Sequence, residues 1–269
     1  MKASLKYREG IADVRRLVVK IGSRVLVQKT GRPDTRRMRS LVAEIARLRR
    51  AGIEVAVVTS GAIGAGMEAL GMTERPTRLP DLQMAAAVGQ TRLMTRYDEL
   101  FSRAGWRVGQ ILLTHADFHQ TIRRSNARRT IENLLRSRVI PIINENDVVA
   151  DEEIRADLAL GDNDLLASLV VNLIRADLLI LLTTVDGLRE PGAAGRTRRV
   201  RYVEDVTAET FSLVAAHESE LSKGGMLTKL KAAQSASRAG CSTIIANGRL
   251  NGVVARIMAG QDTGTIIPA

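Results

Sequence analysis

Short runs of apolar residues alternate with longer amphipathic segments along most of the chain. Residues 17–21 and 178–182 are apolar runs of strand length, whereas residues 36–50 carry apolar side chains at helical spacing. Strands that alternate with helices indicate a mainly parallel sheet with helices on both faces. We predict strands at residues 17–21, 55–59, 108–113, 139–143, 178–183, 242–246 and 265–267, and helices at residues 36–50, 61–70, 79–104, 125–137, 162–174, 225–239 and 252–259. Pro141 indicates that its strand lies at a sheet edge or begins there.

The length and composition fit one globular domain. A chain of 269 residues buries roughly three-quarters of its unfolded surface. Length alone also allows two domains, but we predict a single domain over residues 1–269, with residues 1–14 as a flexible N-terminal extension. No apolar run approaches the ~20 residues that span a bilayer, and residues 1–10 lack the apolar core of a secretory signal. Together with the single cysteine, Cys241, these features predict a cytoplasmic protein without membrane contact.

The chain is strongly basic, with a net charge of +11 and a pI of about 10.6. Such a charge suits nucleic acid or small anionic ligands. However, 33 of the 40 basic residues are arginines, which indicates a general drift from lysine to arginine, and the arginines are spread along the chain. Aromatic residues, which could stack on bases, make up only 3%. Solvated surface is therefore the main interpretation, an RNA-binding protein is the weaker alternative, and we predict no specific nucleic-acid partner.

Glycines and a buried charge mark the carboxyl ends of the first two predicted strands, where open α/β sheets bind ligands. Lys20 lies in an apolar strand end, where a charge is costly unless it faces an anion or solvent. Gly22 would let the backbone approach a ligand closely. Residues 59–66, TSGAIGAG, lead from a strand into a helix, so they direct N–H groups and the helix dipole towards a negative group. Close packing explains Gly64 and Gly66 equally well.

Two polar clusters follow in the middle of the chain, NEND at residues 144–147 and GDND at residues 161–164. Their amides and carboxylates could hold the ammonium group of an amino acid or a metal ion. Helix capping explains Asp162 by itself, but four carboxylates among eight residues exceed what capping needs. The polar segment between the clusters, residues 148–160, is interpreted as a hairpin or a lid.

Residues 223–229, KGGMLTK, predict a glycine-rich turn that opens a helix, with Lys229 in its first turns. A lysine there opposes the helix dipole, and a bound phosphate would explain that cost. An exposed surface lysine is the alternative. The chain has no lysine between residues 30 and 222, so Lys20 and Lys229 persist where arginine would be expected. Because an ammonium group and a guanidinium group are not interchangeable, this favours a function for both lysines.

These motifs resemble the amino-acid kinase family, and within it the glutamate 5-kinases. The resemblance covers residues 18–267 and rests on VVKIGS, TSGAIGAG, QMAAAVGQTRLM, PIINEND, GDND, LLILLTTVDGL and GGMLTKLKAA in this order. It implies a three-layer αβα sandwich around a mainly parallel sheet of about eight strands. It also implies ATP and Mg²⁺ as cofactors, phosphorylation of the glutamate side chain to glutamyl 5-phosphate, and a role as the first step of proline biosynthesis.

The resemblance also assigns roles to residues, and these roles stay expectations. Lys20 and Lys229 would neutralise phosphate charge and Asp164 would hold them in place, whereas the ligands of the metal are not identified. The glutamate site would consist of Ser60, Gly61, Ala62, Asn144, Asp147 and Asn163. The ATP site would consist of Lys20, Gly22, Ser23, Thr183, Thr184, Lys223, Gly224, Gly225, Met226, Thr228 and Lys229.

The chain departs from the family pattern in several places. Thr184 stands where an aspartate is usual, Lys223 stands where a threonine is common, and residues 148–160 form a longer segment than usual. We also expect a short form without the C-terminal PUA domain that many bacterial members carry.

A glutamate side chain is already ionised at neutral pH, so phosphorylation needs positioning and charge neutralisation rather than a general base. The three histidines fit no catalytic triad and are interpreted as structural or surface residues. Two further alternatives are a sibling kinase that acts on N-acetylglutamate, aspartate, carbamate or UMP, and a catalytically inactive homologue. Expected partners beyond L-glutamate and ATP are proline as a feedback inhibitor, glutamyl phosphate reductase and further copies of the same chain in a homo-oligomer.

Overall fold

The computed structural model describes residues 7–28, 33–149, 162–192, 196–217 and 220–269. Within them, the main sheet has seven strands in the order β3-β4-β2-β1-β5-β8-β9. The seven strands are β1 (Arg16–Ile21), β2 (Glu54–Val58), β3 (Arg107–Leu113), β4 (Val139–Glu145), β5 (Leu178–Thr183), β8 (Ser242–Asn247) and β9 (Thr265–Ile267). Every pairing is parallel except that between β8 and β9, so the predicted fold is confirmed with seven strands in place of about eight.

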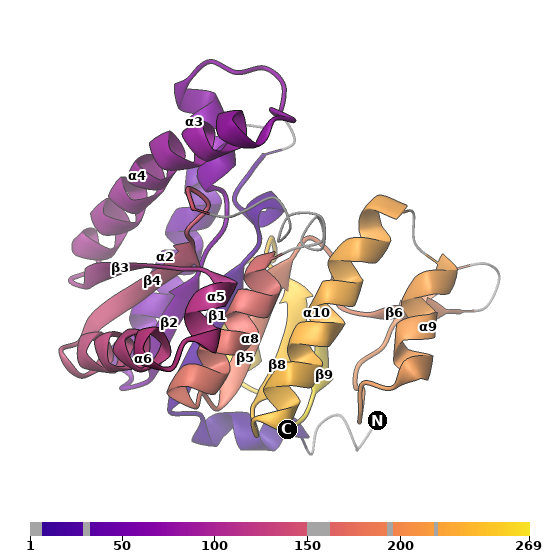
Figure 1. Ribbon diagram of the computed structural model, residues 1–269. Coiled ribbons are helices and arrows are strands. Elements are labelled where there is room, and N and C mark those ends of the chain that lie inside the picture. The colour runs from indigo at the N-terminus through magenta and orange to yellow at the C-terminus, as the bar shows by residue number, and fades with distance from the viewer. Residues whose placement is uncertain (1–6, 29–32, 150–161, 193–195, 218–219) are drawn as a thin grey trace.

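Helices cover both faces of this sheet (Figure 1). They include α2 (Thr35–Arg50), α3 (Ala62–Ala69), α4 (Leu79–Arg103), α5 (His115–His119), α6 (Thr121–Arg136), α8 (Asp162–Ile174), α9 (Ala208–His217), α10 (Glu220–Arg238) and α11 (Val253–Met258), with short 3₁₀ turns at Gly10–Asp13 and Ser23–Val25. The described residues include no helix that is long and apolar enough to cross a membrane.

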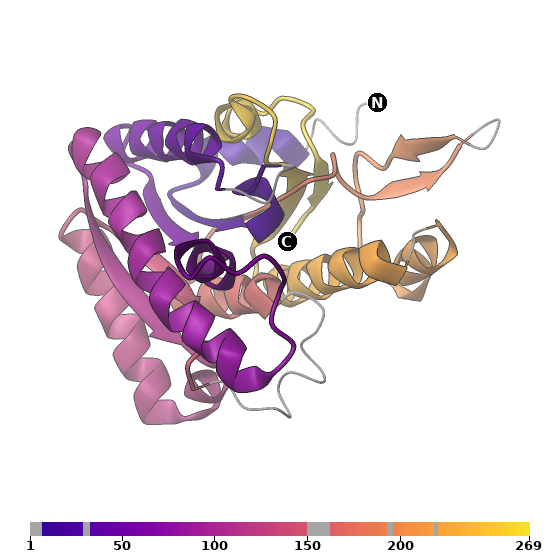
Figure 2. The same ribbon diagram turned by 90° about the horizontal axis from the view of Figure 1, so that it is seen from above.

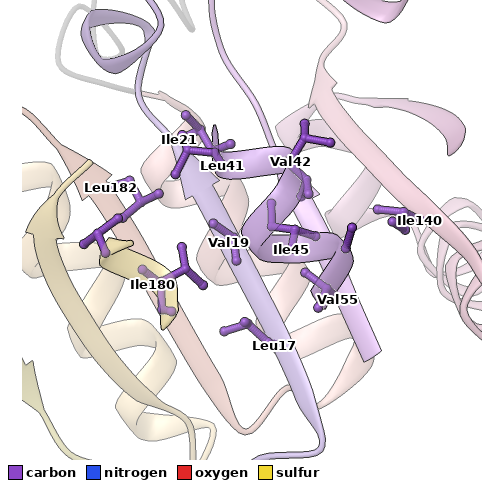
Figure 3. Close-up of a cluster of buried hydrophobic side chains, with 14 of the residues drawn as sticks. Leu17, Val19, Ile21, Leu41, Val42, Ile45, Val55, Ile140, Ile180 and Leu182 are labelled. Carbon is purple, nitrogen blue, oxygen red and sulfur yellow. The ribbon is translucent and has the colours of Figure 1, made fainter. Parts of the chain in front are cut away.

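Two hydrophobic cores lie on opposite faces of the sheet because successive strand side chains point to opposite faces. On one face, Leu17, Val19 and Ile21 of β1 pack with α2, α4 and α11; Figure 3 shows Leu41, Val42 and Ile45 of α2 over these strands. On the other face, Val18 packs with α6, α8 and α10.

A small antiparallel hairpin and α9 extend to one side of this body (Figure 2). The hairpin consists of β6 (Arg189–Pro191) and β7 (Thr197–Arg199). It lacks the continuous apolar runs that mark the main strands, so the sequence did not predict it.

The prediction for Pro141 is wrong, because β4 lies between β3 and β2 inside the sheet. Pro141 is opposite Gly109 of β3, whereas the register with β2 begins only at Ile142. Pro141 therefore needs no N–H group to pair with β2. For this reason the sheet can hold a proline in an interior strand.

The part of the predicted N-terminal extension that the structure describes, residues 7–14, packs onto the domain instead. The side chain of Ile11 lies in the hydrophobic core, and Arg8 is 2% exposed. Arg8 donates hydrogen bonds to the carbonyls of Gln261, Thr263 and Gly264 near the C-terminus. These hydrogen bonds hold the N-terminal segment against the domain. They join residues near the two ends of the sequence, so no local sequence pattern predicts them.

Candidate active site

The alternation of β1 directs Lys20 towards α8 and α10. Lys20 lies two residues after Val18, so both side chains point to the same face of the sheet. Asp164 lies in the first turn of α8, and Lys229 lies in α10, which packs beside α8. Residues from three distant segments, at positions 20, 164 and 229, therefore meet near the carboxyl ends of the strands, as the sequence predicts.

The three side chains form a buried ion cluster centred on Asp164. Lys20 Nζ lies 2.8 Å from Asp164 Oδ1, and Lys229 Nζ lies 2.9 Å from Asp164 Oδ2. Lys229 Nζ also donates to the Gly225 carbonyl at 2.8 Å. Lys20 is 5% exposed, Asp164 1% and Lys229 9%. These three side chains comprise two cations and one anion.

The pKa of Asp164 reflects this arrangement. Burial raises the pKa, but the charges of Lys20 and Lys229 and their hydrogen bonds lower it by more, so the pKa lies below its ordinary value. Asp164 is therefore ionised at neutral pH. It fixes both ammonium groups in place without offering a proton for catalysis.

A second polar contact joins the start of α8 to the segment after β2. Asn163 Nδ2 donates to Ser60 Oγ at 2.8 Å. Gly61 follows with a φ of 106°, a backbone conformation that favours glycine, and directly precedes α3, which begins at Ala62. The predicted substrate residues Ser60, Gly61 and Asn163 thus lie together, and Asn163 directly precedes Asp164 of the ion cluster.

Asn144 belongs to the same edge of the sheet, since it lies near the carboxyl end of β4, next to β2. It is 2% exposed, and its Nδ2 donates to Gln90 Oε1 of α4 at 2.8 Å. Sequence reasoning did not select Gln90 as a site residue, although it lies in the AAAVGQ motif. It also missed Thr59, which is fully buried and hydrogen-bonds to Tyr97 at 2.8 Å.

Gly22, Gly64 and Gly66, the glycines of the first two motifs, have different surroundings. Gly22 donates to the Leu182 carbonyl at 3.1 Å, and a Cβ there would lie 3.1 Å from that oxygen, so its close approach is to β5. A Cβ on Gly66 would overlap the Ala85 carbonyl at 1.7 Å, whereas one on Gly64 would meet no atom within 4 Å. Packing therefore explains Gly66, as a contact between α3 and α4, but it does not explain Gly64.

The predicted glycine-rich turn at residues 223–225 is wrong. Helix α10 begins at Glu220 and continues through Gly224 and Gly225, so Lys229 lies in a later turn than expected. A glycine in a helix costs about 1 kcal/mol, and packing of Leu230, Ala233 and their neighbours against the core offsets this. The helix dipole therefore does not indicate that Lys229 binds phosphate. Its contacts with Asp164 and Gly225 are the evidence that Lys229 belongs to the cluster.

The other predicted site residues differ in how deeply they are buried. Met226 is 4% exposed and packs in the core, and Thr228 Oγ1 donates to the Gly225 carbonyl at 3.2 Å. Ser23 is exposed, whereas Ala62 is buried and Asp147, Thr183 and Thr184 are half-buried. Most of residues 148–160 and the side chain of Lys223 lie outside the described parts of the structure.

One basic hollow lies away from this site. Its volume is about 440 Å³, and the residues that line it include Arg124, Arg128 and Arg175, from α6 and the end of α8. Arg175 thus lies near Arg124 and Arg128, from which it is distant in the sequence. None of the predicted site residues lines this hollow.

The comparisons with known proteins agree with the fold and the motifs. The sequence model of the amino acid kinase family matches residues 15–247. Glutamate 5-kinase from Pelobacter propionicus is 43% identical over 96% of this chain and 69% of its own length. Glutamate 5-kinase from Clostridium tetani is 40% identical over 96% of both chains. The chain therefore belongs to the amino acid kinase family, and within it to the glutamate 5-kinases.

Solved structures support the same fold at much lower identity. Carbamate kinase from Giardia lamblia bound to AMP-PNP has a TM-score of 0.63 at 15% identity and covers 96% of this chain and 99% of its own. UMP kinase from Bacillus anthracis has a TM-score of 0.59 at 15% identity, with 95% and 96% covered. These likenesses show that the chain shares its overall fold with both structures.

Proposed function

We propose that this protein transfers the γ-phosphoryl group of ATP to the side-chain carboxylate of L-glutamate, which yields glutamyl 5-phosphate in the first step of proline biosynthesis. Membership of the glutamate 5-kinases supports the reaction. The single structural observation that carries it is the Lys20–Asp164–Lys229 cluster, which holds two ammonium groups at the carboxyl edge of the sheet.

The chemistry of the transfer explains why this site has cations and amides. Both the acceptor carboxylate and the triphosphate are negative at neutral pH, so their mutual repulsion opposes the reaction. Lys20 and Lys229 offset that repulsion and stabilise the charge on the phosphoryl oxygens in the transition state. Asp164 stays ionised and keeps both lysines in position before the substrates bind.

The two buried ammonium groups suit the phosphates of a nucleoside triphosphate. The described residues contain no group of three or more histidine, cysteine, aspartate or glutamate side chains that could hold a metal. Magnesium, when present, would enter with the phosphates of ATP and supply further charge neutralisation, because Mg²⁺ commonly binds through substrate phosphates and water.

A substrate panel tests the proposal. L-glutamate, N-acetylglutamate, aspartate, carbamate and UMP are each offered with ATP and Mg²⁺, and ADP release is measured for all, with hydroxamate trapping for the acyl phosphates. We expect L-glutamate to be the preferred acceptor and N-acetylglutamate to be rejected, since acetylation removes the α-ammonium group that Asp147, Asn144 and Asn163 are proposed to bind. Equal use of N-acetylglutamate would contradict the proposed pocket.

The same pocket supports a proposal for regulation. Proline carries a cationic ring nitrogen and a carboxylate, so we expect it to compete with glutamate. The measurement varies glutamate at fixed ATP, with and without proline, in the wild type and in Asp147→Ala. An Asp147→Ala enzyme with unchanged dependence on glutamate would reject the role of Asp147. A homo-oligomer, a cytoplasmic location and association with glutamyl phosphate reductase stay predictions.

A further inference from the structure

The amide pair formed by Asn144 and Gln90 leaves hydrogen-bonding atoms unused. Asn144 Nδ2 donates to Gln90 Oε1, whereas Gln90 Nε2 and Asn144 Oδ1 are buried without a partner among the described residues. Asn163 Oδ1 is buried and unpartnered in the same way. An unsatisfied buried polar atom costs about 1–3 kcal/mol, so three of them in predicted site residues and a contact partner of one need an explanation.

The position of Gln90 is fixed by the packing of the residue before it. A Cβ on Gly89 would lie 1.7 Å from the Ala62 carbonyl, so α4 touches the first turn of α3 at this point. Helices α3 and α4 therefore cannot separate without losing this contact. Gln90 is held beside the segment that carries Ser60 and Gly61.

The three unpartnered atoms match the charged groups at the α-carbon of an amino acid. Asn144 Oδ1 and Asn163 Oδ1 are acceptors, which suit an ammonium group, and Gln90 Nε2 is a donor, which suits a carboxylate. The strand order β1-β2-β4 places Lys20 and Asn144 two strand spacings apart, roughly 10 Å. An amino acid whose reacting carboxylate lies near Lys20 would therefore direct its α-carbon towards β4.

We propose that Gln90 is a specificity-determining residue that donates a hydrogen bond from Nε2 to the α-carboxylate of the amino-acid substrate. Its Oε1 at the same time holds Asn144 so that Asn144 Oδ1 faces the α-ammonium group. This inference rests on the proposed function and extends it, because it explains how the enzyme distinguishes an α-amino acid from a simple dicarboxylate or an amide.

The opposite orientation of both amides makes a different prediction. If both side chains were turned over, Gln90 Oε1 would be free to accept from the ammonium group and Asn144 Nδ2 would be free to donate to the carboxylate. A glutamate at position 90 separates the two arrangements. Its carboxylate would repel the α-carboxylate in the first arrangement and attract the ammonium group in the second.

The experiment compares kcat/KM for glutamate, for isoglutamine (the α-amide of glutamate) and for glutarate in the wild type, Gln90→Leu and Gln90→Glu. Gln110→Leu, on the exposed surface of β3, is the control. We expect Gln90→Leu to lower kcat/KM roughly tenfold to a hundredfold for glutamate, and to lower it less for isoglutamine, which lacks the α-carboxylate, and for glutarate, which lacks the α-ammonium group. Gln90→Glu should lower the use of glutamate further and spare isoglutamine. Gln110→Leu should change none of the three.

An equal loss for all three acceptors, with the fold retained, would show that Gln90 only supports the structure and would overturn the proposal. Improved use of glutamate by Gln90→Glu would overturn it in favour of the opposite orientation. A wild-type enzyme that does not phosphorylate glutamate would instead overturn the proposed function, and the inference with it.

Discussion

Among the described residues, Asp164 and Asp262 each contact more than one cation, but the two clusters differ in their cations and their burial. Asp164 is 1% exposed and contacts two lysines, Lys20 and Lys229. The side chain of Asp262 is 30% exposed and contacts three arginines, Arg8, Arg199 and Arg201, at 3.0–3.7 Å. The first cluster joins β1 to two helices, whereas the second joins the N-terminal segment and β7 to the loop before β9.

The comparison shows what each kind of cation does in an arginine-rich chain. In the Asp262 cluster, Arg8 uses its planar fork to bond three backbone carbonyls, so the guanidinium group serves as a structural tie. In the Asp164 cluster, each lysine supplies a compact charge on a flexible stem, which can turn from aspartate to phosphate. This difference agrees with the proposed phosphate role of Lys20 and Lys229 in a chain where 33 of the 40 basic residues are arginines.

The largest loss of unfolding free energy should come from Asp164→Asn. This substitution removes the anion that both buried lysines contact, and breaking a buried ion pair costs about 3–5 kcal/mol. The pKa of Asp164 is lowered in the folded protein, so its ionisation stabilises the fold above the ordinary value near 3.8 and this contribution is lost as pH falls further. Urea unfolding from pH 7 to pH 3 measures this.

The stability difference between wild type and Asp164→Asn should therefore be greatest near pH 7 and shrink below about pH 4. A difference that stays constant with pH would show that ionisation of Asp164 does not contribute to stability. Asn163→Ala, at the neighbouring position, is the control and should not change the acid dependence.

The next largest effect should be a loss of turnover. Lys20→Ala and Lys229→Ala should each lower turnover roughly a hundredfold to a thousandfold, because one preorganised charge is lost from the transition state. Lys229→Arg should also impair turnover, since the fork cannot reproduce a point charge at the same place. Steady-state kinetics, with circular dichroism to confirm the fold, measures this.

Lys231→Ala is the matched control, since Lys231 is an exposed lysine on the same helix, and its turnover should be unchanged. Full activity in a folded Lys229→Ala enzyme would remove Lys229 from the active site.

Arg8→Lys should have a smaller effect, and on stability alone. An ammonium group cannot reach all three carbonyls that the Arg8 fork bonds, so about 2 kcal/mol of unfolding free energy should be lost. Turnover should be unchanged because the Asp262 cluster contains no predicted site residue. A loss of turnover without a loss of stability would contradict the structural role given to this arginine.

Much of the fold is predictable because its signals are local. Apolar runs such as those of β1 and β5 mark buried parallel strands, and each predicted strand has a counterpart in the sheet. The start of α10 was not predictable in this way, since Gly224 and Gly225 are common helix breakers and only tertiary packing keeps them helical. The contact of Arg8 with carbonyls more than 250 residues away likewise has no local signal.

The candidate site was predictable to the extent that its residues carry unusual chemistry for their position. A lysine in an apolar strand and two clusters of polar residues stand out in the sequence, and Lys20, Asn163 and Asp164 lie together in the structure. Gln90 did not stand out, because a glutamine on an amphipathic helix is usually a surface residue. Its part-buried hydrogen bond to Asn144 places it beside a predicted site residue, and this contact is what led to the proposal for Gln90.

The smallest loss of unfolding free energy should come from Asp262→Asn. The side chain keeps its shape but loses its charge, and because Asp262 is 30% exposed, solvent screens its attraction to the arginines. Partly exposed ion pairs contribute up to about 1 kcal/mol, so we expect a loss within that range in urea unfolding. Since Arg8 keeps its bonds to the carbonyls, the loop before β9 should stay in place. High salt should narrow the gap between wild type and Asp262→Asn, because the Debye length falls to about 3 Å at 1 M, whereas the buried Asp164 cluster should respond much less. An Asp262→Asn cost as large as that of Asp164→Asn, or one that salt does not reduce, would show that burial is not what separates the two clusters.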